Sequence, residues 1–305
     1  MEEGISVIIA TENRGEQMST ILAHLEQQTF PAAQFEVIVV IDADESTTKR
    51  VVQRHSEGAP IRIRCYIQNK RGRVTGENRG IREAKFNHVL FLRDDLLAAP
   101  HLLERHYKHQ LEHPEGCAIL GGADPHPQMP TNTLTRNGMA LHRVTLKAGQ
   151  PIHYLDWNSD NLSLPTRYLL KANGFDETCP YPYMEARELG WRLQSTNIPA
   201  FYEPQCLAYE WLGTTMDEGR DYAYQRGYAL YWLAERTRAI DIYKRYTLAQ
   251  NPLRNFIQWL LMPFYIRACR QSQDKGQPLF RFIQRIYNYE MRRGFNDAAR
   301  GKSPQ

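Results

Sequence analysis

The sequence predicts an α/β fold: a doubly wound, mixed but mostly parallel sheet with helices on both faces. Two continuous apolar runs, Ile5 to Ala10 and Val37 to Ile41, are typical of strands that are buried on both faces of a sheet. Between them, the stretch Gln17 to Leu25 places its apolar residues at the spacing of one helix face. A buried strand, an amphipathic helix and a second buried strand form the repeating unit of a parallel sheet.

The same alternation continues to about residue 122. After Ile41 the predicted elements are, in order, a helix at Thr47–His55, a strand at Ile61–Tyr66, a helix at Thr75–Lys85, a strand at His88–Leu92, a helix after Pro100 and a strand at Cys117–Leu120. Residues 1–122 are therefore expected to form a nucleotide-binding half of the doubly wound type.

A second half with a different pattern follows. From Gly121 the chain is rich in proline and polar residues, and an exposed strand at 139–145 and helices at 166–172 and 184–196 are predicted after this stretch. Residues 220–305 are dense in Tyr, Trp and Arg and are predicted to be helical almost throughout. We therefore expect one α/β domain over residues 1–219, divided into the halves 1–122 and 123–219, and a helical extension over residues 220–305.

Composition and charge exclude several classes of protein. With 42% apolar and 24% charged residues over 305 positions, the chain is an ordinary folded protein and neither disordered nor disulfide-dense. The net charge of +4 is too small to indicate nucleic acid as a partner. The five cysteines are scattered without metal-ligand spacing and fit buried thiols in a reducing compartment. The start of the chain lacks the features of a signal peptide, so a cytoplasmic protein is expected.

Polar residues follow several predicted strands, at the edge where open α/β sheets bind their ligands. Thr11 to Gly15 follow the first strand, Asp42 to Ser46 the second, and Arg93 to Asp95 the fourth. Each group taken alone is equally typical of a helix N-cap. Their occurrence after three strands favours a ligand site at one edge of the sheet.

In this order, the motifs resemble family 2 glycosyltransferases of the GT-A fold. The resemblance covers roughly residues 5–230. The matching segments are Thr11-x-Asn13-Arg14, Gln28-Thr29, the strand Glu36 to Asp42, Gly72 with Asn78-x-Gly80, Phe91 to Asp95, Asn161-Leu162-Ser163, Gly174 to Glu177, and Glu185-x-x-Glu188 with Leu189 to Leu193. Each segment is weak alone, and the signal lies in their shared order.

The resemblance implies an enzyme that transfers a sugar from a nucleoside diphosphate sugar to an acceptor hydroxyl, usually with inversion at the anomeric carbon. The acceptor would be a saccharide, a lipid-linked molecule or a small molecule. A divalent cation, Mn²⁺ or Mg²⁺, would neutralise the leaving diphosphate, with Asp95 as its first ligand. For Arg71 and Arg73, a solvated basic loop is an equal alternative to phosphate contact. The residues implied to bind the nucleotide sugar are Thr11, Asn13, Arg14, Asp42, Arg71, Arg73, Asn78, Arg93 and Asp94.

The chain departs from the family pattern at several of these positions. Arg93 stands where the family usually has an acidic residue, so the expected pair of metal-binding carboxylates is halved. Ala186 replaces the Asp that is the family's expected general base, and an alanine cannot take a proton. Glu210 stands where a histidine commonly joins the metal shell. Ala43 and Glu77 also replace residues that are usually acidic and basic, respectively.

Two interpretations remain open. In the first, the site is rewired: Glu210 is an oxygen ligand of the cation beside Asp95, Arg93 supplies charge to the diphosphate, and Glu185 or Glu188 is the base. In the second, the chain is a catalytically degenerate subunit that binds a nucleotide sugar or a partner protein without transfer. Glu185 and Glu188, three residues apart on a predicted helix, also fit a solvated helical face with arginine partners.

The C-terminal extension is basic, with 16 Lys or Arg against 6 Asp or Glu over residues 220–305. The simpler interpretation is a helical subdomain with a solvated basic face. The functional interpretation is peripheral contact of residues 220–300 with anionic lipid on the inner face of a membrane. No RNA-binding motif accompanies the pattern, so nucleic acid is not expected as a partner. No apolar stretch reaches the ~20 residues that a spanning helix needs.

Overall fold

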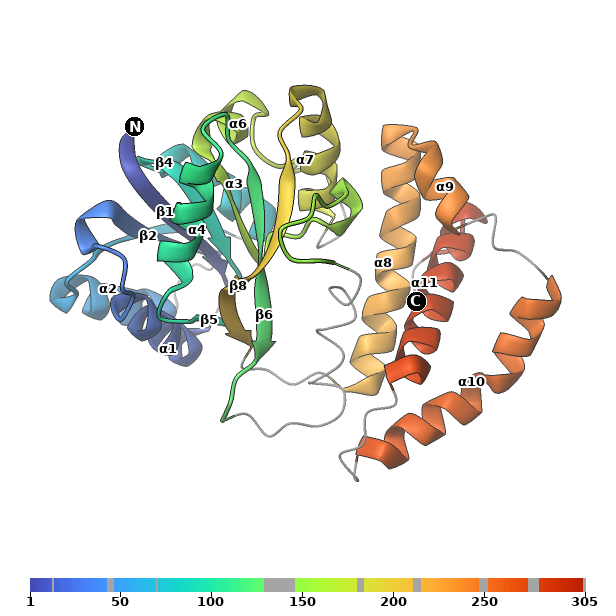
Figure 1. Cartoon of the computed structure of the whole chain (residues 1–305). Helices are drawn as coiled ribbons and strands as arrows, with labels where there is room; N and C mark the ends of the chain where they lie inside the picture. Colours follow the sequence, from blue (N-terminus) through green and yellow to red (C-terminus); the bar gives the residue numbers. More distant parts are fainter. Residues whose placement is uncertain are drawn as a thin grey trace. The chain divides into compact units, whose positions relative to one another are not determined.

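A computed structural model describes residues 1–12, 14–42, 47–69, 71–128, 146–179, 184–210, 215–246, 252–273 and 280–303. The chain forms two compact units. The first consists of residues 1–126, 146–180 and 185–211, and the second of residues 127–145, 181–184 and 212–305. The strands lie in the first unit, and long helices dominate the second (Figure 1).

The first unit is built on an eight-stranded mixed sheet. Its order is β3-β2-β1-β4-β7-β6-β8-β5, and the pairs β1/β2, β1/β4, β2/β3 and β6/β8 are parallel. This arrangement confirms the predicted doubly wound, mostly parallel GT-A sheet. The strands are β1 (Glu2–Thr11), β2 (Phe35–Asp42), β3 (Arg62–Gln68), β4 (Phe86–Leu92), β5 (Leu96–Ala98), β6 (Ala118–Pro125), β7 (Asn161–Pro165) and β8 (Ala200–Glu210).

Helices cover both faces of this sheet (Figure 1). All eight residues of β2 are buried, as its continuous apolar run predicts. On one face, Ile8, Ile38 and Phe91 share a core with Leu169 and Leu189 from two of the helices. The helices are α1 (Gly15–Glu26), α2 (Thr47–Gly58), α3 (Arg73–Glu83), α4 (Leu102–Glu112), α6 (Thr166–Lys171) and α7 (Glu185–Leu193), with short 3-10 turns at Ala32–Gln34, Tyr154–Asp156 and Gln194–Thr196.

Strands β5, β7 and β8 are not among the predicted strands. Strand β7 lies inside the sheet, yet Asn161 and Ser163 interrupt its apolar pattern. Both side chains are fully buried because the imidazole of His106 lies 2.9 Å from Asn161 Oδ1 and 2.8 Å from Ser163 Oγ. The short alternation from Asn161 to Leu164 would predict a strand with one face in solvent, whereas polar residues with partners in the core let β7 be buried on both faces.

Two other expectations need adjustment. The helix predicted at 184–196 is shorter, because α7 ends at Leu193 and the 3-10 turn Gln194–Thr196 follows it. Asn197 then adopts a left-handed conformation, with φ of 54°, which ends the helical segment. The exposed strand predicted at 139–145 lies outside the described residues.

The second unit contains the predicted C-terminal helices. Two of them, α8 and α11, pack so closely that glycine is required at the crossing. A Cβ at Gly227 would lie 1.8 Å from the Met291 carbonyl oxygen, and a Cβ at Gly294 would lie 2.0 Å from that of Tyr224. The described helices include none that is both long and apolar enough to cross a membrane. The helices of the second unit are α8 (Met216–Thr237), α9 (Ile240–Tyr246), α10 (Pro252–Gln273) and α11 (Phe280–Ala299).

Candidate active site

Residues singled out from the sequence meet at the carboxyl ends of β1, β2 and β4. These strands are parallel neighbours, so the residues that follow them lie along one edge of the sheet. Thr11 Oγ1 donates a hydrogen bond of 2.8 Å to Asp94 Oδ2, and Arg14 Nε lies 3.2 Å from the same oxygen. Burial raises the pKa of Asp94, and the charge of Arg14 opposes that rise. Asn13 lies outside the described residues.

Asp42, the last residue of β2, holds the loop that begins α3. Its Oδ1 accepts the backbone N–H of Arg71 at 2.9 Å, and its Oδ2 accepts that of Gly72 at 2.7 Å. Gly72 has a φ of +84°, a conformation that favours glycine, and it directly precedes the helix. Asp42 is therefore buried and bound to backbone, while the Arg71 side chain is exposed.

Arg73 joins three polar side chains from different parts of the first unit. Its Nη1 donates to Glu77 Oε1 at 2.7 Å and to Ser159 Oγ at 2.8 Å, and its Nη2 pairs with Glu185 Oε1. Ser159 Oγ also donates to Glu185 Oε1, at 3.0 Å. Glu185 is fully buried, and its Oε2 has no hydrogen-bond partner among the described residues. The structure thus brings together Arg73, a predicted phosphate contact, and Glu185, a predicted base.

Glu77 keeps its proton at neutral pH. Burial raises the pKa of Glu77 to about 8, an effect that Arg73 opposes and the nearby Glu185 carboxylate reinforces. Two carboxylates that share one guanidinium cannot both ionise easily at this site. Glu77 Oε2 and Glu185 Oε2 both lack a hydrogen-bond partner among the described residues.

This arrangement predicts a pH-dependent gain in stability for Glu77→Gln. The pKa of Glu77 is raised in the folded protein to about 8, so between about 4.5 and about 8 the unfolded chain ionises while the folded chain holds its proton. Wild type loses stability over that range as the pH rises, whereas a glutamine cannot titrate. Denaturant unfolding at about pH 5 and about pH 8 should show the variant gaining relative to wild type. A difference that is constant with pH would contradict this.

Arg93, directly after β4, is enclosed by three carboxylates. Its Nε pairs with Asp95 Oδ1, its Nη2 pairs with Glu210 Oε1, and its Nη1 lies 3.1 Å from Asp160 Oδ2. Burial alone would lower the pKa of Arg93, but the carboxylates of Asp160, Asp95 and Glu210 raise it well above its ordinary value. Burial raises the pKa of Glu210 to about 7 although Arg93 opposes the rise. The guanidinium is therefore a permanent cation at this strand end.

The predicted cation ligands Asp95 and Glu210 are thus brought together, but around a guanidinium. A Mn²⁺ or Mg²⁺ ion needs oxygen atoms that converge on one point. The described part of the chain has no group of three or more Asp, Glu, His or Cys side chains that could hold a metal ion. Glu210 Oε2 is buried and lacks a hydrogen-bond partner among these residues, but Arg93 stands between it and Asp95. With Arg93 in this position the residues do not fit a metal site.

Asn78 and Glu188, also singled out from the sequence, make other contacts. The Asn78 amide donates to the Phe175 carbonyl and to Glu177 Oε1, and its Oδ1 accepts the Phe175 N–H, so it joins α3 to the segment after α6. Arg192 Nε and Nη2 donate to the Glu188 carboxylate at 2.7 to 2.9 Å, which is the helical ion pair left open by the sequence. The solvated face expected with this pair is wrong, because Glu185 and Glu188 are both buried. The Asn78 and Glu188 side chains are therefore engaged in contacts within the first unit.

Three site residues escaped prediction as functional residues. Ser159 and Asp160 directly precede β7, which was not among the predicted strands, so nothing marked them as strand-end residues. The matching segment Asn161-Leu162-Ser163, which follows them, was the available signal. Glu77 was noted only as a departure from the family pattern, although its i, i+4 spacing from Arg73 predicts their ion pair.

Named relatives of this chain are glycosyltransferases. The chain is 29% identical over 222 residues to validoxylamine A glucosyltransferase of Streptomyces hygroscopicus subsp. jinggangensis, an alignment that covers 64% of this chain and 52% of that protein. The same enzyme of subsp. limoneus is also 29% identical over 222 residues, with 49% of its length covered. The chain therefore spans about half the length of these relatives.

Solved structures share the fold at low sequence identity. The mannosyltransferase PcManGT from Pyrobaculum calidifontis, in complex with GDP-Man and Mn²⁺, has a TM-score of 0.65 at 17% identity over 99% of this chain and 89% of that one. Residues 1–349 of TarS from S. aureus, in complex with UDP, have a TM-score of 0.56 at 16% identity over 99% and 93%. The family model described as Glycosyl transferase family 2 matches residues 6–164, about half of the chain. The chain therefore belongs to glycosyl transferase family 2.

Proposed function

We propose that this chain moves a sugar from a nucleoside diphosphate sugar to an acceptor hydroxyl, with inversion at the anomeric carbon. Glu185 carries the proposal: its Oε1 is fixed by Arg73 and Ser159, while its Oε2 is unpaired among the described residues. A fixed carboxylate with one unpaired oxygen is suited to accept the proton of an acceptor hydroxyl. Because Glu185 is fully buried, the acceptor must displace the side chains that cover it.

For the sugar donor, we propose that the nucleotide binds at the carboxyl ends of the strands. Asp42 fixes the loop at Arg71 and Gly72, which would line the nucleotide. PcManGT binds Mn²⁺ together with GDP-Man, and the resemblance implies the same use of a cation here. In this chain the carboxylates surround Arg93 instead. We therefore propose that Arg93 offsets part of the carboxylate charge at this strand end, and that the exposed Arg71 supplies positive charge to the diphosphate.

The acceptor is proposed at the level of its chemical class. The relatives include proteins named for validoxylamine A and for poly(ribitol-phosphate), so their names point to different acceptors. A saccharide, lipid-linked or small-molecule hydroxyl therefore stays the proposed acceptor. Glu185 and its neighbours on α7 lie in the half that would receive it.

Hydrolysis of a panel of nucleotide sugars tests the proposed activity. We expect calorimetry to detect nucleoside diphosphate binding in EDTA, and we expect slow hydrolysis of at least one of UDP-glucose, UDP-GlcNAc and GDP-mannose. Released nucleoside diphosphate, measured over time with EDTA or Mn²⁺, provides the readout. A complete lack of nucleotide binding with either additive would overturn the assignment of the strand ends.

A non-catalytic binding subunit is the second candidate. Ala186, at the position where the family pattern has its base, is fully buried on α7 and offers no titratable group. In that case nucleotide would bind to wild type, and neither wild type nor Ala186→Asp would release sugar from any donor. Binding without turnover in both proteins would favour this candidate over the transferase.

A further inference from the structure

Helix α10 is apolar on two faces, and the second unit covers only one of them. Met262, Tyr265 and Cys269 of α10 pack in a common core with Ile283 and Ile286 of α11. A second set of large side chains on the same helix is exposed to solvent: Ile257 (46%), Trp259 (58%), Leu260 (60%), Leu261 (38%) and Phe264 (60%). A soluble surface helix normally presents polar residues on its outer face, so this exposed apolar surface is unusual.

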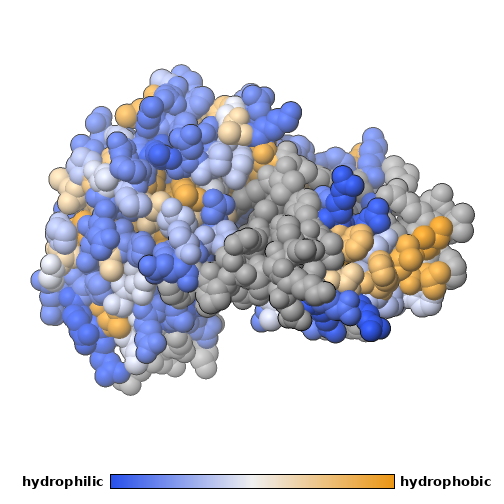
Figure 2. All heavy atoms as spheres, turned by 60° about the horizontal axis from the view of Figure 1, so that its bottom comes forward, coloured by the Kyte–Doolittle hydropathy of each residue, from blue (hydrophilic) through white to orange (hydrophobic). Residues whose placement is uncertain are grey.

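Ile257, Leu260, Leu261 and Phe264 recur at the spacing of one helix face and are named here the α10 face, whereas Trp259 lies on another side of the helix and lines the pocket described below. Figure 2 shows hydrophobic side chains gathered on the second unit, with hydrophilic side chains beside them. A large exposed apolar patch with a polar rim marks a surface for a protein or a membrane. The charges around the patch distinguish the two.

The surroundings of the α10 face are basic. Helix α10 contains three arginines and no acidic residue, and residues 252–303 contain ten Lys or Arg against three Asp or Glu. The side chains of Arg267 and Arg281 are exposed. Arginines around exposed Trp, Leu and Phe match the acyl region and the anionic headgroups of a bilayer, where tryptophan prefers the boundary.

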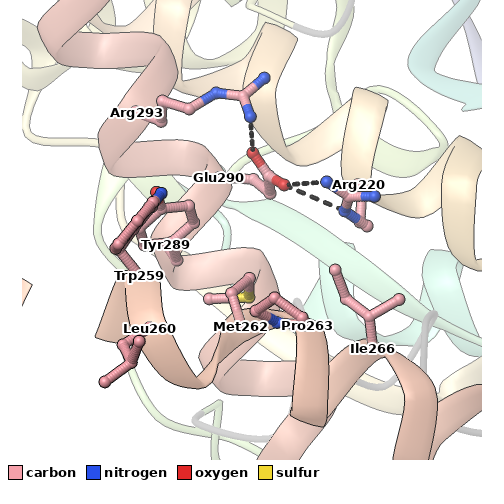
Figure 3. Close-up of a pocket in the computed structure, with 9 residues that line it drawn as sticks. All are labelled: Arg220, Trp259, Leu260, Met262, Pro263, Ile266, Tyr289, Glu290 and Arg293. Carbon is pink, nitrogen blue, oxygen red and sulfur yellow. Dashed lines mark hydrogen bonds and ion pairs between the residues drawn. The ribbon is translucent and has the colours of Figure 1, made fainter. Parts of the chain in front are cut away.

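A pocket beside this face also combines apolar side chains with basic ones. It has a volume of about 330 Å³, with an apolar wall from α10 that includes Trp259 and Pro263 (Figure 3). At its other side, Glu290 pairs with Arg220 at 2.7 Å and with Arg293 at 3.0 Å. Two guanidinium groups on one carboxylate leave a net charge of +1 next to apolar side chains. Such a pocket suits an amphiphile with an anionic head.

We propose that the α10 face docks on the surface of an anionic lipid bilayer, with the helix in the plane of the interface. Helix α10 would lie on the membrane and would not cross it, since no described helix is long and apolar enough to span one. The proposal does not depend on sugar transfer, because it rests on residues of the second unit alone.

Vesicle sedimentation of the full chain tests the proposal. At low ionic strength, wild type should sediment with vesicles that contain phosphatidylglycerol and stay in solution with pure phosphatidylcholine, and added salt should weaken the binding. Ile257→Ser, Leu260→Ser and Phe264→Ser, combined in one protein, should lower the partition by about 10-fold or more. Arg267→Gln with Arg281→Gln should reduce the preference for anionic lipid while leaving the apolar residues in place.

A matched control tests whether vesicle binding depends on the α10 face or on any exposed apolar side chain. Leu111 and Leu170 are exposed by 60% and 48% on helices of the first unit, so Leu111→Ser with Leu170→Ser should bind vesicles like wild type. Circular dichroism must show that every variant keeps its helices. Equal binding to neutral and anionic vesicles, or an unchanged triple variant, would overturn the proposal. So would light scattering that shows a wild-type dimer which the triple variant dissociates, because a second copy would then cover the face.

Discussion

Glu185→Gln should slow sugar transfer by about 10²- to 10⁴-fold, the usual contribution of general-base assistance. Glutamine keeps the shape and the hydrogen bonds to Arg73 and Ser159, so the affinity for the donor nucleotide should change little. Steady-state kinetics with a competent acceptor, together with calorimetry of nucleotide binding, separates kcat from donor affinity.

Glu188→Gln is the control for this experiment. Glu188 lies on the same helix, but its carboxylate is held by Arg192, so the variant should lose far less turnover. Full activity of Glu185→Gln would show that the base lies elsewhere, and a large loss in Glu188→Gln would then identify the residue. Ala186→Asp should raise activity if the site keeps the family geometry, although neighbouring helix residues point ~100° apart.

Arg93→Met should lower the free energy of unfolding by about 3–5 kcal/mol and abolish nucleotide binding in EDTA. Methionine fills much of the space but leaves Asp95, Asp160 and Glu210 close together without their cation, and removing one partner of a buried ion pair costs about that much. Denaturant unfolding and calorimetry measure the two effects. Arg79→Met, which removes a half-exposed helical pair with Glu83, should cost less than about 1 kcal/mol.

Arg93→Asp distinguishes a substituted cation from a structural arginine. Four carboxylates without a guanidinium would bind a divalent cation, so nucleotide binding by this variant should appear only with Mn²⁺. Nucleotide binding by wild type should not change when EDTA is added. Wild-type nucleotide binding that strengthens 10-fold or more on addition of Mn²⁺ would contradict the role assigned to Arg93 and would restore the predicted cation site at Asp95 and Glu210.

The fold and the position of the site were predictable because apolar runs ending in polar residues mark buried strands and their carboxyl ends. Thr11, Asp42 and Asp94 follow directly from that pattern. The hydrogen-bond partners of these residues were harder to predict. Asp42 binds the backbone of the loop before α3, which only the tertiary structure reveals. The i, i+4 pair of Arg192 with Glu188 needed no tertiary information, and it was anticipated as the helical alternative.

The arginine networks could not be predicted, because each one joins segments that are far apart in sequence. Arg93 and Glu210 are 117 positions apart, and Arg73 and Glu185 are 112 apart. Spacing rules act only within one helix or strand, so the sequence identified these residues as candidates without identifying their partners. Asp160 was missed because the strand after it has buried polar side chains.

The contact between Arg93 and Glu210 also constrains how this site could have diverged. Both residues differ from the family pattern, which has an acid at the first position and a histidine at the second, and here they form a direct ion pair. Reverting only Arg93 would surround Glu210 with like charges, and reverting only Glu210 would remove one of the three carboxylates around a buried guanidinium. The effect of each substitution therefore depends on the residue at the other position. A lineage that has fixed both could return to the family pattern one residue at a time only where a divalent cation takes the place of the guanidinium, as expected for Arg93→Asp.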